Sequence, residues 1–383
     1  MSTIAYFDNA ATTFPKPEEV YRFMDSFYRK NGVNAGRGQY ALASSAANMV
    51  NETRQLLLSL FHCPAKKVVF THSATEALNI VLQGIPIRNG ANVYISPFEH
   101  NAVTRVLEFL SSKNHINVIQ LSVQKQTIVF DTDEISRQFK RHNPDVVIMS
   151  HASNTCGVIA PIEDICSLAK QYGAITLIDA AQTAGLIELD LNKEVYDFVV
   201  FAGHKTLYGP FGVAGFISSD RIQPLPLVYG GTGIDSANQS LPTSTPERYE
   251  VGSLNLQAIA GLNAALTWNR KVGLDTIYKV EQSNHSKLIE LLSKYENINI
   301  IKPKGDCVGV VSCLFEGYSS DNIGNVLNKH NVAVRTGMHC SPFAHKFLGT
   351  FPSGTVRFSV SYFTNNSDFM ILENALDYIE KNS

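Results

Sequence analysis

The sequence predicts an α/β protein in which a large domain with a mostly parallel sheet is followed by a smaller α+β domain. Two observations support this prediction. Between residues 67 and 203, short Val- and Ile-rich runs alternate with segments of helical periodicity, which is typical of parallel strands covered by helices on both faces. Beyond residue 254, two long helical patterns are followed by a mixture of strands and helices.

Composition limits the class of protein. The 383 residues are enough for two or three domains of about 150 residues each. A hydrophobic content of 44% and a charged content of 17% are typical of soluble globular proteins. The net charge of −2 argues against nucleic acid or an anionic membrane as the main partner. No apolar run reaches the ~18 residues of a membrane span, and no secretory signal is visible at the N-terminus.

The cysteines indicate a reducing environment. The chain has 6 cysteines, irregularly spaced and without a CxxC pair, so a zinc ribbon or a thioredoxin-like motif is not indicated. Free thiols in the cytoplasm are the simplest interpretation.

The large domain is expected to contain strands that end in chemically active residues. The expected strands are 67–72, 92–96, 145–151, 174–179 and 197–203, and helical patterns follow the first three. Polar residues gather where these strands end, at 71–75, 99–100, 151–154, 179–182 and 204–205. Ligands of parallel sheets bind at the carboxyl ends of the strands, so these positions predict one site.

The C-terminal third is expected to form the smaller domain. Helices are predicted at 255–273, 275–296, 320–330 and 367–380, and strands at 308–315, 332–337 and 354–360. We therefore predict a large domain over 15–255 and a small domain over 256–383. The N-terminal segment 1–14 is predicted to be part of the small domain, which carries the loop of Cys340. The Gly-, Ser-, Thr- and Pro-rich stretch 229–247 is expected to be a long loop, and such loops are usually functional or mobile.

Two charged residues follow buried strands. Lys205 lies among glycines in "AGHKTLYGPFG". A single lysine is usually solvent-exposed, but one so placed can also form a Schiff base with a cofactor aldehyde. Asp179 ends the apolar strand "TLID". It can cap a helix, or it can pair with the protonated pyridine nitrogen of pyridoxal phosphate.

Three further strand ends add polar groups. "THSATEALN" places small and hydroxyl residues at a strand-to-helix turn, which suits either an ordinary helix cap or a phosphate site. His100 in "FEHNAV" and Asn154 in "SHASNTCG" end other strands. Each has a structural interpretation on its own, but five polar strand ends together favour a functional site.

Cys340 in "RTGMHCSPFAHKFLGT" allows three interpretations. It can bind zinc together with His339 and His345, although adjacent residues rarely bind one ion and no fourth ligand is evident. It can be a packed structural thiol, as most cysteines are. It can also be a nucleophile, because Gly, Ser and Pro indicate an exposed loop, and His339, Arg335 and Lys346 are cations that favour a thiolate.

Eight motifs occur in order along the chain: "YFDNAATT", "THSATEALN", "EHNA", "SNTCG", "IDAAQ", "GHKTLYGPFG", "YEVGSLN" and "RTGMHCSP". Together they resemble the cysteine desulfurase family of class V aminotransferase-fold enzymes, over about residues 5 to 380. The resemblance implies the aspartate aminotransferase-like fold (fold type I) and pyridoxal 5'-phosphate as cofactor.

The resemblance also implies roles for particular residues. Lys205 would bond covalently to the cofactor and move the Cα proton of the substrate. His100 would stack on the cofactor ring and act in acid–base steps, and Cys340 would accept sulfur as a persulfide. The cofactor would further be bound by Ala74, Thr75, Asp179, Gln182, His204 and, from the neighbouring subunit, Ser253.

Substrate and partners follow from the same resemblance. Asn154 and Arg357 would hold the substrate carboxylate, with Arg335 in support. The implied reaction converts L-cysteine to L-alanine in a homodimer with shared active sites, without a metal. The short segment between Cys340 and the strand of Arg357 resembles the group II subclass, whose members depend on a sulfur-acceptor protein. Selenocysteine lyase is the alternative activity, and another class V lyase or transferase is a third.

Two positions depart from the family pattern. Ala202 stands where family members usually have a hydroxyl residue, so one phosphate contact is expected to be missing. His345 is an additional histidine in the cysteine loop. It can tune Cys340, guide an acceptor or simply pack, and the sequence alone does not choose between these roles.

Overall fold

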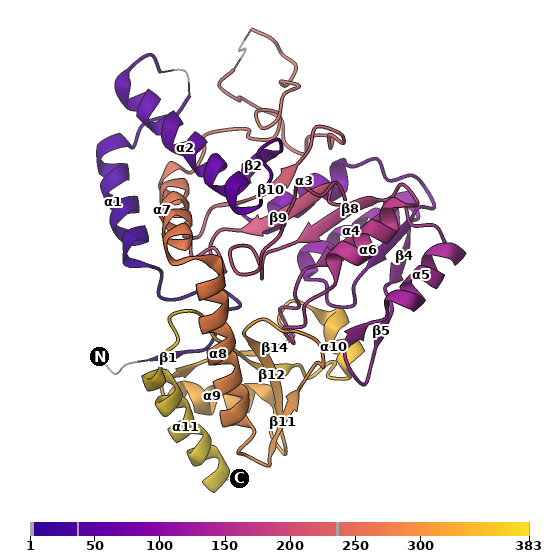
Figure 1. Cartoon of the computed structure of the whole chain (residues 1–383), viewed down its shortest axis with the longest axis vertical. Helices are drawn as coiled ribbons and strands as arrows, with labels where there is room; N and C mark the ends of the chain where they lie inside the picture. Colours follow the sequence, from indigo (N-terminus) through magenta and orange to yellow (C-terminus); the bar gives the residue numbers. More distant parts are fainter. Residues whose placement is uncertain (1–3, 37, 235–236, 383) are drawn as a thin grey trace.

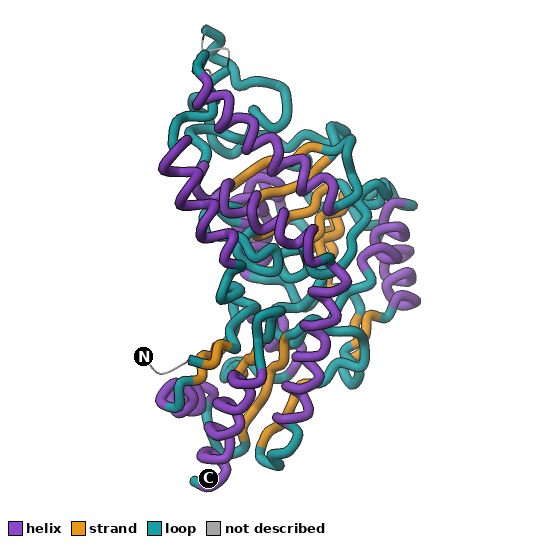
Figure 2. Tube along the Cα trace, turned by 60° about the vertical axis from the view of Figure 1, so that its left-hand side comes forward, coloured by secondary structure: helices purple, strands orange, loops and turns teal. Residues whose placement is uncertain are grey.

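The computed structural model describes residues 4–36, 38–234 and 237–382. Figure 1 shows two separate sheets, a large one in the upper part of the molecule and a smaller one below it, each with helices packed on it. The N-terminal and C-terminal ends of the described chain both lie in the lower part (Figures 1 and 2). The predicted α/β fold class is confirmed.

The large sheet has seven strands in the order β2-β10-β9-β8-β7-β3-β4. All neighbours are parallel except β10, which runs antiparallel to both β2 and β9. The strands are β2 (Lys67–Thr71), β3 (Asn92–Ile95), β4 (Asn117–Gln120), β7 (Val146–Ser150), β8 (Ile175–Asp179), β9 (Phe198–Ala202) and β10 (Ala214–Ser218).

Strand side chains alternate between two apolar cores because neighbouring residues of a strand point to opposite faces. In β2, Val69 packs in one core and Val68 and Phe70 pack in the other. Helices cover both faces, which explains why the strands consist of unbroken apolar runs. The helices of this part are α1 (Glu18–Asn31), α2 (Ala41–Leu60), α3 (Ala74–Gly84), α4 (Asn101–Asn114), α5 (Thr132–Arg141), α6 (Ile162–Lys170) and α7 (Leu256–Val272).

The smaller sheet is antiparallel, with four strands in the order β11-β12-β15-β14. Its strands are β11 (Ile298–Ile301), β12 (Val310–Phe315), β14 (Arg335–Gly337) and β15 (Thr355–Ser359). Helices α8 (Leu274–Leu292), α9 (Ser320–Lys329), α10 (Pro342–Leu348) and α11 (Asn366–Lys381) complete this part.

The N-terminal segment joins the smaller part. Strand β1 (Ala5–Tyr6) pairs in parallel with β13 (Val332–Ala333). Phe7 then packs in the same core as Phe358 of β15. The predicted strand 332–337 is divided in the structure, because β13 pairs with β1 whereas β14 pairs with β15.

The domain boundary at residues 255 and 256, with segment 1–14 in the small domain, stays a proposal. The first helix after the proposed boundary, α7, packs against α1 and α2 and shares its core with the large sheet. Helix α8 continues from it toward the smaller sheet (Figure 1). The two long helices therefore pass from one part of the molecule to the other.

Three further features bear on the sequence predictions. Residues 229–234 and 237–247 contain no helix or strand, and this stretch extends away from the body near α2 (Figure 1). A two-stranded hairpin of β5 (Val123–Gln124) and β6 (Val129–Phe130) lies beside the large sheet. Within the described ranges, no helix is long and apolar enough to cross a membrane.

Gly215 lies in β10, between β2 and β9, where a side chain has no room. A Cβ atom there would lie 2.1 Å from the carbonyl oxygen of Val69 and 2.8 Å from the ring of Phe201. Because the close atom is backbone of the neighbouring strand, we expect Gly215→Ala to lower the free energy of unfolding by about 3 kcal/mol. Gly305→Ala, whose nearest neighbour would be 3.9 Å away, is the control. Equal urea midpoints for the two variants would contradict this expectation.

Candidate active site

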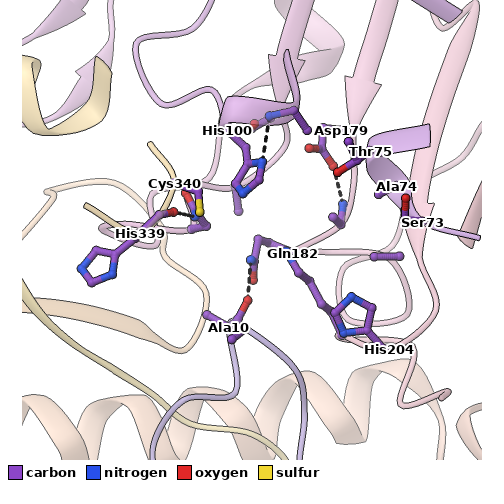
Figure 3. A pocket seen from close by; sticks show the side chains of 18 of the residues that line it. Ala10, Ser73, Ala74, Thr75, His100, Asp179, Gln182, His204, His339 and Cys340 are labelled. Atoms are coloured by element: carbon purple, nitrogen blue, oxygen red, sulfur yellow. Dashed lines mark hydrogen bonds between the residues drawn. The ribbon is translucent and has the colours of Figure 1, made fainter. Parts of the chain in front are cut away.

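A cavity of about 270 Å³ lies at the carboxyl edge of the large sheet, where the smaller part covers it. Figure 3 shows side chains from several strand ends directed into it. The predicted site residues that line this cavity are Ala74, Thr75, His100, Asn154, Asp179, Gln182, His204, Lys205, Arg335, Cys340 and Arg357. Of all the predicted site residues, only Ser253 does not line this cavity.

One end of the cavity suits an anion. Ser73 caps α3, accepting a hydrogen bond from the backbone N–H of Glu76. Ala74 and Thr75 follow in the first turn, where backbone N–H groups lack helical partners and the helix dipole is positive. Opposite them, the Nδ1 atom of His204 is buried and has no hydrogen-bond partner among the described residues, so this ring is free to bind a ligand atom.

The segment that carries Lys205 is fixed from behind by the N-terminal segment. The Nζ atom of Lys16 donates to the carbonyl oxygen of His204 (2.6 Å) and to the hydroxyl of Thr13 (2.7 Å). The Thr13 hydroxyl in turn donates to the carbonyl oxygen of Lys205 (2.9 Å). Burial lowers the pKa of Lys205 from its ordinary value, and the carboxylate of Asp179 opposes this shift. A lysine with a lowered pKa is a better nucleophile and base.

Asp179 ends β8 inside the cavity and is only 8% exposed. Its Oδ1 atom accepts a hydrogen bond from the backbone N–H of Ala181 (2.9 Å). No cation of the described chain lies within salt-bridge distance of this carboxylate. Because an unpaired buried carboxylate is costly, the site fits a ligand that carries a proton toward Asp179.

Glu99 lies behind this wall, fully buried. It accepts hydrogen bonds from the backbone N–H of Ser150 (2.7 Å), from the Ser150 hydroxyl (2.9 Å) and from the Ser96 hydroxyl (2.5 Å). Burial raises the pKa of Glu99 to about 7. Glu99 therefore fixes Ser150, a residue of the cavity wall, in a single orientation.

His100 caps α4 and lines the cavity. Its Nδ1 atom accepts a hydrogen bond from the backbone N–H of Ala102 (3.0 Å), so the proton of the neutral ring is on Nε2. Burial and, next, the charge of Lys205 lower the pKa of His100 from its ordinary value. A neutral ring with a fixed tautomer can stack on an aromatic ligand and carry one proton.

The loop of Cys340 is held by the side chain of Asn154. The Nδ2 atom of Asn154 donates to the carbonyl oxygen of His339 (2.8 Å), and its Oδ1 atom accepts from the Ser341 hydroxyl (2.8 Å). The backbone N–H of Asn101 donates to the carbonyl oxygen of Cys340 (2.7 Å). His339 and Cys340 have φ angles of 48° and 57°, a left-handed turn that side chains adopt only when their surroundings require it.

Arg357 is the largest buried cation of the site, at 2% exposure. Its NH2 atom donates to Asp8 (2.8 Å) and its NH1 atom donates to the carbonyl oxygen of Asn154 (2.9 Å). Its Nε atom is buried without a partner in the described structure. Arg335 is half-exposed and also binds Asp8. Both arginines line the same cavity as Cys340.

Of the six cysteines, Cys63, Cys156, Cys166 and Cys313 are buried and Cys307 is half-buried. None forms a disulfide, and Cys340 alone is exposed. Burial raises the pKa of Cys307 to about 12, which leaves that thiol unreactive. Cys340, the exposed cysteine, lines the cavity that Lys205 and Asp179 also line.

These features fit pyridoxal 5'-phosphate. Ala74, Thr75 and His204 would hold its phosphate, Asp179 its ring nitrogen, and His100 its ring face. The unpaired carboxylate of Asp179 and the unpartnered Nδ1 atom of His204 are the observations that this cofactor explains. When bound, pyridoxal phosphate supplies an electron sink for carbanions next to an amino group.

Comparison with known proteins decides the family. The family model "Aminotransferase class-V" matches residues 5–372. A probable cysteine desulfurase of Pyrococcus abyssi is 30% identical over 367 residues, which cover 93% of this chain and 89% of that protein. A probable cysteine desulfurase of Methanothermobacter thermautotrophicus is 28% identical, over 98% of this chain and 94% of that protein.

The chain belongs to the cysteine desulfurase family.

The fold comparison agrees with this assignment. An apo structure of cysteine desulfurase from Thermococcus onnurineus NA1 has a TM-score of 0.91 and 28% identity, and covers 99% of this chain and 95% of that chain. The predicted family and the predicted cofactor, pyridoxal phosphate, are confirmed. The roles of single residues stay proposals, and the structure gives them positions.

The structure bears on two sequence predictions: that Ser253 reaches the cofactor of the neighbouring subunit, and that His339 supplies charge to Cys340. Ser253 lines another cavity, together with residues of the loop after Gly231, and does not line that of Lys205. The ring of His339 is directed away from the cavity (Figure 3) and bonds to the Thr355 hydroxyl (2.8 Å). Burial lowers the pKa of His339 to about 2, so its ring is neutral and supplies no charge to Cys340.

His345 supplies no charge to Cys340 either, because burial lowers its pKa to about 4. His345 is fully buried on α10, where its Nδ1 atom bonds to the Thr350 hydroxyl (2.7 Å). Lys346 lies over the rings of Phe343 and Phe351. No group of three potential metal ligands occurs in the described ranges. Of the roles considered for His345, packing is therefore the one that its contacts support.

Sequence reasoning assigned no role to Asp8, Lys16 or Glu99, which contact the site residues from behind, although Glu99 was among the polar strand ends. Asp8 lies in the motif "YFDNAATT" and Glu99 directly precedes His100. The place of Asp8 and Glu99 in family motifs was a signal, whereas Lys16 lies outside them. Nothing in the local pattern shows that residues so distant in sequence meet Arg357 or Ser150.

Replacement of His345 tests its buried, neutral state. Burial lowers the pKa of His345 to about 4, whereas in the unfolded chain it is about 6.5. Between these pH values the unfolded state binds the proton and the folded state does not, so His345 destabilises the fold as the pH falls below about 6.5. Asparagine keeps a polar group near the Nδ1 position and does not titrate.

We therefore expect the free energy of unfolding of the wild type, relative to His345→Asn, to fall by about 2 kcal/mol between pH 7 and pH 5. Urea unfolding at both pH values measures this difference. A difference that stays constant with pH would show that His345 is not buried in its neutral form.

Proposed function

We propose that this protein is a pyridoxal-phosphate-dependent cysteine desulfurase that converts L-cysteine to L-alanine and transfers the sulfur to Cys340. The observation that carries the proposal is the position of the chain's exposed cysteine in one cavity with Lys205, Asp179 and His100. The relatives named as cysteine desulfurases match nearly the full length of this chain, which supports the same activity here.

Lys205 and His100 handle protons in this proposal. Burial lowers the pKa of Lys205, which favours the uncharged amine that removal of the Cα proton of the substrate requires. His100 carries its proton on Nε2, the atom not bonded to Ala102. It is therefore suited to donate a proton to, or accept one from, a group next to the ring that it stacks on.

Cys340 takes the sulfur. Its thiolate attacks the substrate sulfur, forming an S–S bond, and the C–S bond breaks with its electron pair going to the substrate carbon. That carbon takes up a proton, so the products are L-alanine and a persulfide on Cys340, and no external oxidant or reductant is needed. Arg335 and Arg357 line the same cavity as Cys340 and bring positive charge to it.

The substrate carboxylate is bound by Arg357, with Arg335 in support and Asn154 next to it. The buried Nε atom of Arg357 has no other partner among the described residues, and a guanidinium edge suits a carboxylate. The hydrogen bonds of Asn154 to His339 and Ser341 support a carboxylate site beside the loop of Cys340.

We further propose a cytoplasmic homodimer that passes sulfur to an acceptor protein. Ser253 lies outside its own subunit's cavity, so it is available to a neighbouring subunit. Exposed apolar side chains near the loop 229–247 support an interface there: Leu225, Leu227, Val228, Tyr229 and Ile234. Exposure of Cys340 leaves a persulfide accessible to an acceptor.

Mass spectrometry after addition of L-cysteine tests the proposed activity. We expect a mass gain of one sulfur atom on Cys340, with L-alanine released. Cys340→Ala should reduce sulfur transfer from L-cysteine by roughly 100-fold or more, because the acceptor is lost. Release of selenium from L-selenocysteine by the same variant is the control, since selenium leaves without this thiol. The absence of both alanine and persulfide in the wild type would refute the proposal.

Mixed dimers test whether Ser253 acts on the neighbouring subunit. A dimer of one Lys205→Ala and one Ser253→Ala subunit should contain one complete site, because Lys205 and Ser253 then meet across the interface. A dimer of wild type and the Lys205→Ala, Ser253→Ala double variant should contain none. Calorimetric titration measures the affinity of each mixed dimer for pyridoxal phosphate. Loss of the Ser253 contact should weaken this binding about tenfold. The reverse pattern would show that Ser253 acts in its own subunit.

A further inference from the structure

Asp8 lies at the point where the N-terminal segment meets β15. Its backbone forms a parallel bridge with Ser359. The flanking residues are held on both sides, since Ser359 donates its N–H to the carbonyl oxygen of Phe7 (2.7 Å) and the Asn9 side chain donates to the carbonyl oxygen of Ser359 (2.9 Å). The carboxylate of Asp8 is therefore presented from a fixed backbone.

This carboxylate binds two guanidinium groups. The NH2 atom of Arg357 donates to Oδ1 of Asp8 (2.8 Å). Arg335 donates to the same carboxylate from Nε (3.1 Å) and NH2 (3.0 Å). Such charge-assisted, multiple contacts fix both the position and the plane of a guanidinium.

The contacts of Arg357 leave one guanidinium nitrogen, Nε, for a ligand. Asp8 takes the NH2 atom and the carbonyl oxygen of Asn154 takes the NH1 atom. The Nε atom is buried without a partner in the described structure, in a residue that lines the cavity. The side chain cannot turn toward the cavity or away from it without breaking the bond to Asp8.

The net charge of Asp8, Arg335 and Arg357 also suits a carboxylate ligand. Two guanidinium groups and one carboxylate leave a single positive charge at this wall of the cavity, which matches one substrate carboxylate. Without Asp8, Arg357 would be a cation at 2% exposure with no counter-ion within salt-bridge distance in the described chain, and buried unpaired charges are strongly unfavourable.

We propose that Asp8 is the positioning residue for recognition of the α-carboxylate: its side chain fixes Arg357 so that the free guanidinium edge faces the carboxylate of an amino-acid substrate. The proposal rests on the proposed function, in which Arg357 binds that carboxylate. Asp8 does not touch the substrate itself. Asp8 also binds Arg335, which lies on β14 five residues before Cys340. It therefore links the binding site for the substrate carboxylate to the strand that leads to Cys340.

Two ligands that differ only at the carboxylate separate this role from a merely structural one. L-Alanine carries the carboxylate, and L-alaninamide replaces it by an amide of similar size. We expect Asp8→Asn to weaken binding of L-alanine to the pyridoxal-phosphate-loaded protein by about tenfold or more, as loss of a charged hydrogen bond predicts. Binding of L-alaninamide should change by less than about twofold. Calorimetric titration measures both constants.

Kinetics with L-cysteine provide a second measurement. Asp8→Asn should raise KM with a small change in kcat, because the carboxylate is bound equally in ground and transition states. Equal weakening of both ligands, or no weakening of either, would overturn the proposal. Should Asp8→Asn fail to fold, Asp8→Glu keeps the charge on a longer side chain that displaces the guanidinium. Several-fold weaker L-alanine binding is then expected, and unchanged binding would overturn the proposal.

Asp145→Asn is the matched control. Asp145 also binds an arginine, Arg88 (2.8 Å), and accepts a backbone N–H, from Asn92 (2.8 Å), but it lies outside the cavity. Neither ligand constant should change in this variant. A wild type that binds L-alanine no better than L-alaninamide would instead refute the role of Arg357 in the proposed function, which distinguishes that failure from failure of the role of Asp8.

Discussion

The site depends on the parallel direction of the strands of the large sheet. Because β3, β7, β8 and β9 run the same way, the residues that follow them lie at one edge of the sheet. His100, Asn154, Asp179 and Lys205 are brought together in this way, from segments far apart in sequence. A strand with reversed direction would move its terminal residue to the opposite edge and remove it from the cavity.

A second constraint is the burial of charge where the two parts of the molecule meet. Arg357, Asp8 and Glu99 are each held by several polar groups, as buried charged groups require. These contacts join the N-terminal segment, the large sheet and the smaller sheet around one cavity. Cys340 differs from them in being exposed, yet Asn154 and Asn101 hold its loop by hydrogen bonds to the backbone and to Ser341. The Cys340 thiol is thus accessible without being loosely placed.

Much of this could be predicted from the sequence, for identifiable reasons. Val- and Ile-rich runs that end in Asp179 or before Lys205 predict buried parallel strands with a ligand site at their ends. The structure has the buried strands, and a cavity lined by Asp179 and Lys205 lies where they end. Local patterns do not reveal which distant segments meet. The pairing of β1 with β13, the contact of Asp8 with Arg357 and the orientation of His339 away from Cys340 are set by tertiary packing, so no periodicity or spacing predicts them. His345 was left open because Thr350, its partner, lies beyond the helix that carries it.

The antiparallel strand β10 has a consequence for how the protein folds. It pairs with β9, its near neighbour in sequence, and also with β2, so that Thr71 lies opposite Ala214. The pairing of β2 with β10 closes a long loop, the chain between these two strands. Closing it costs chain entropy before any contact compensates for that cost. The two pairings place the turn after β2, with Ala74 and Thr75, on one side of β10 and Lys205, after β9, on the other. A cofactor bound to both stabilises the least local pairing of the sheet, and the native architecture of β2 is therefore linked to cofactor supply.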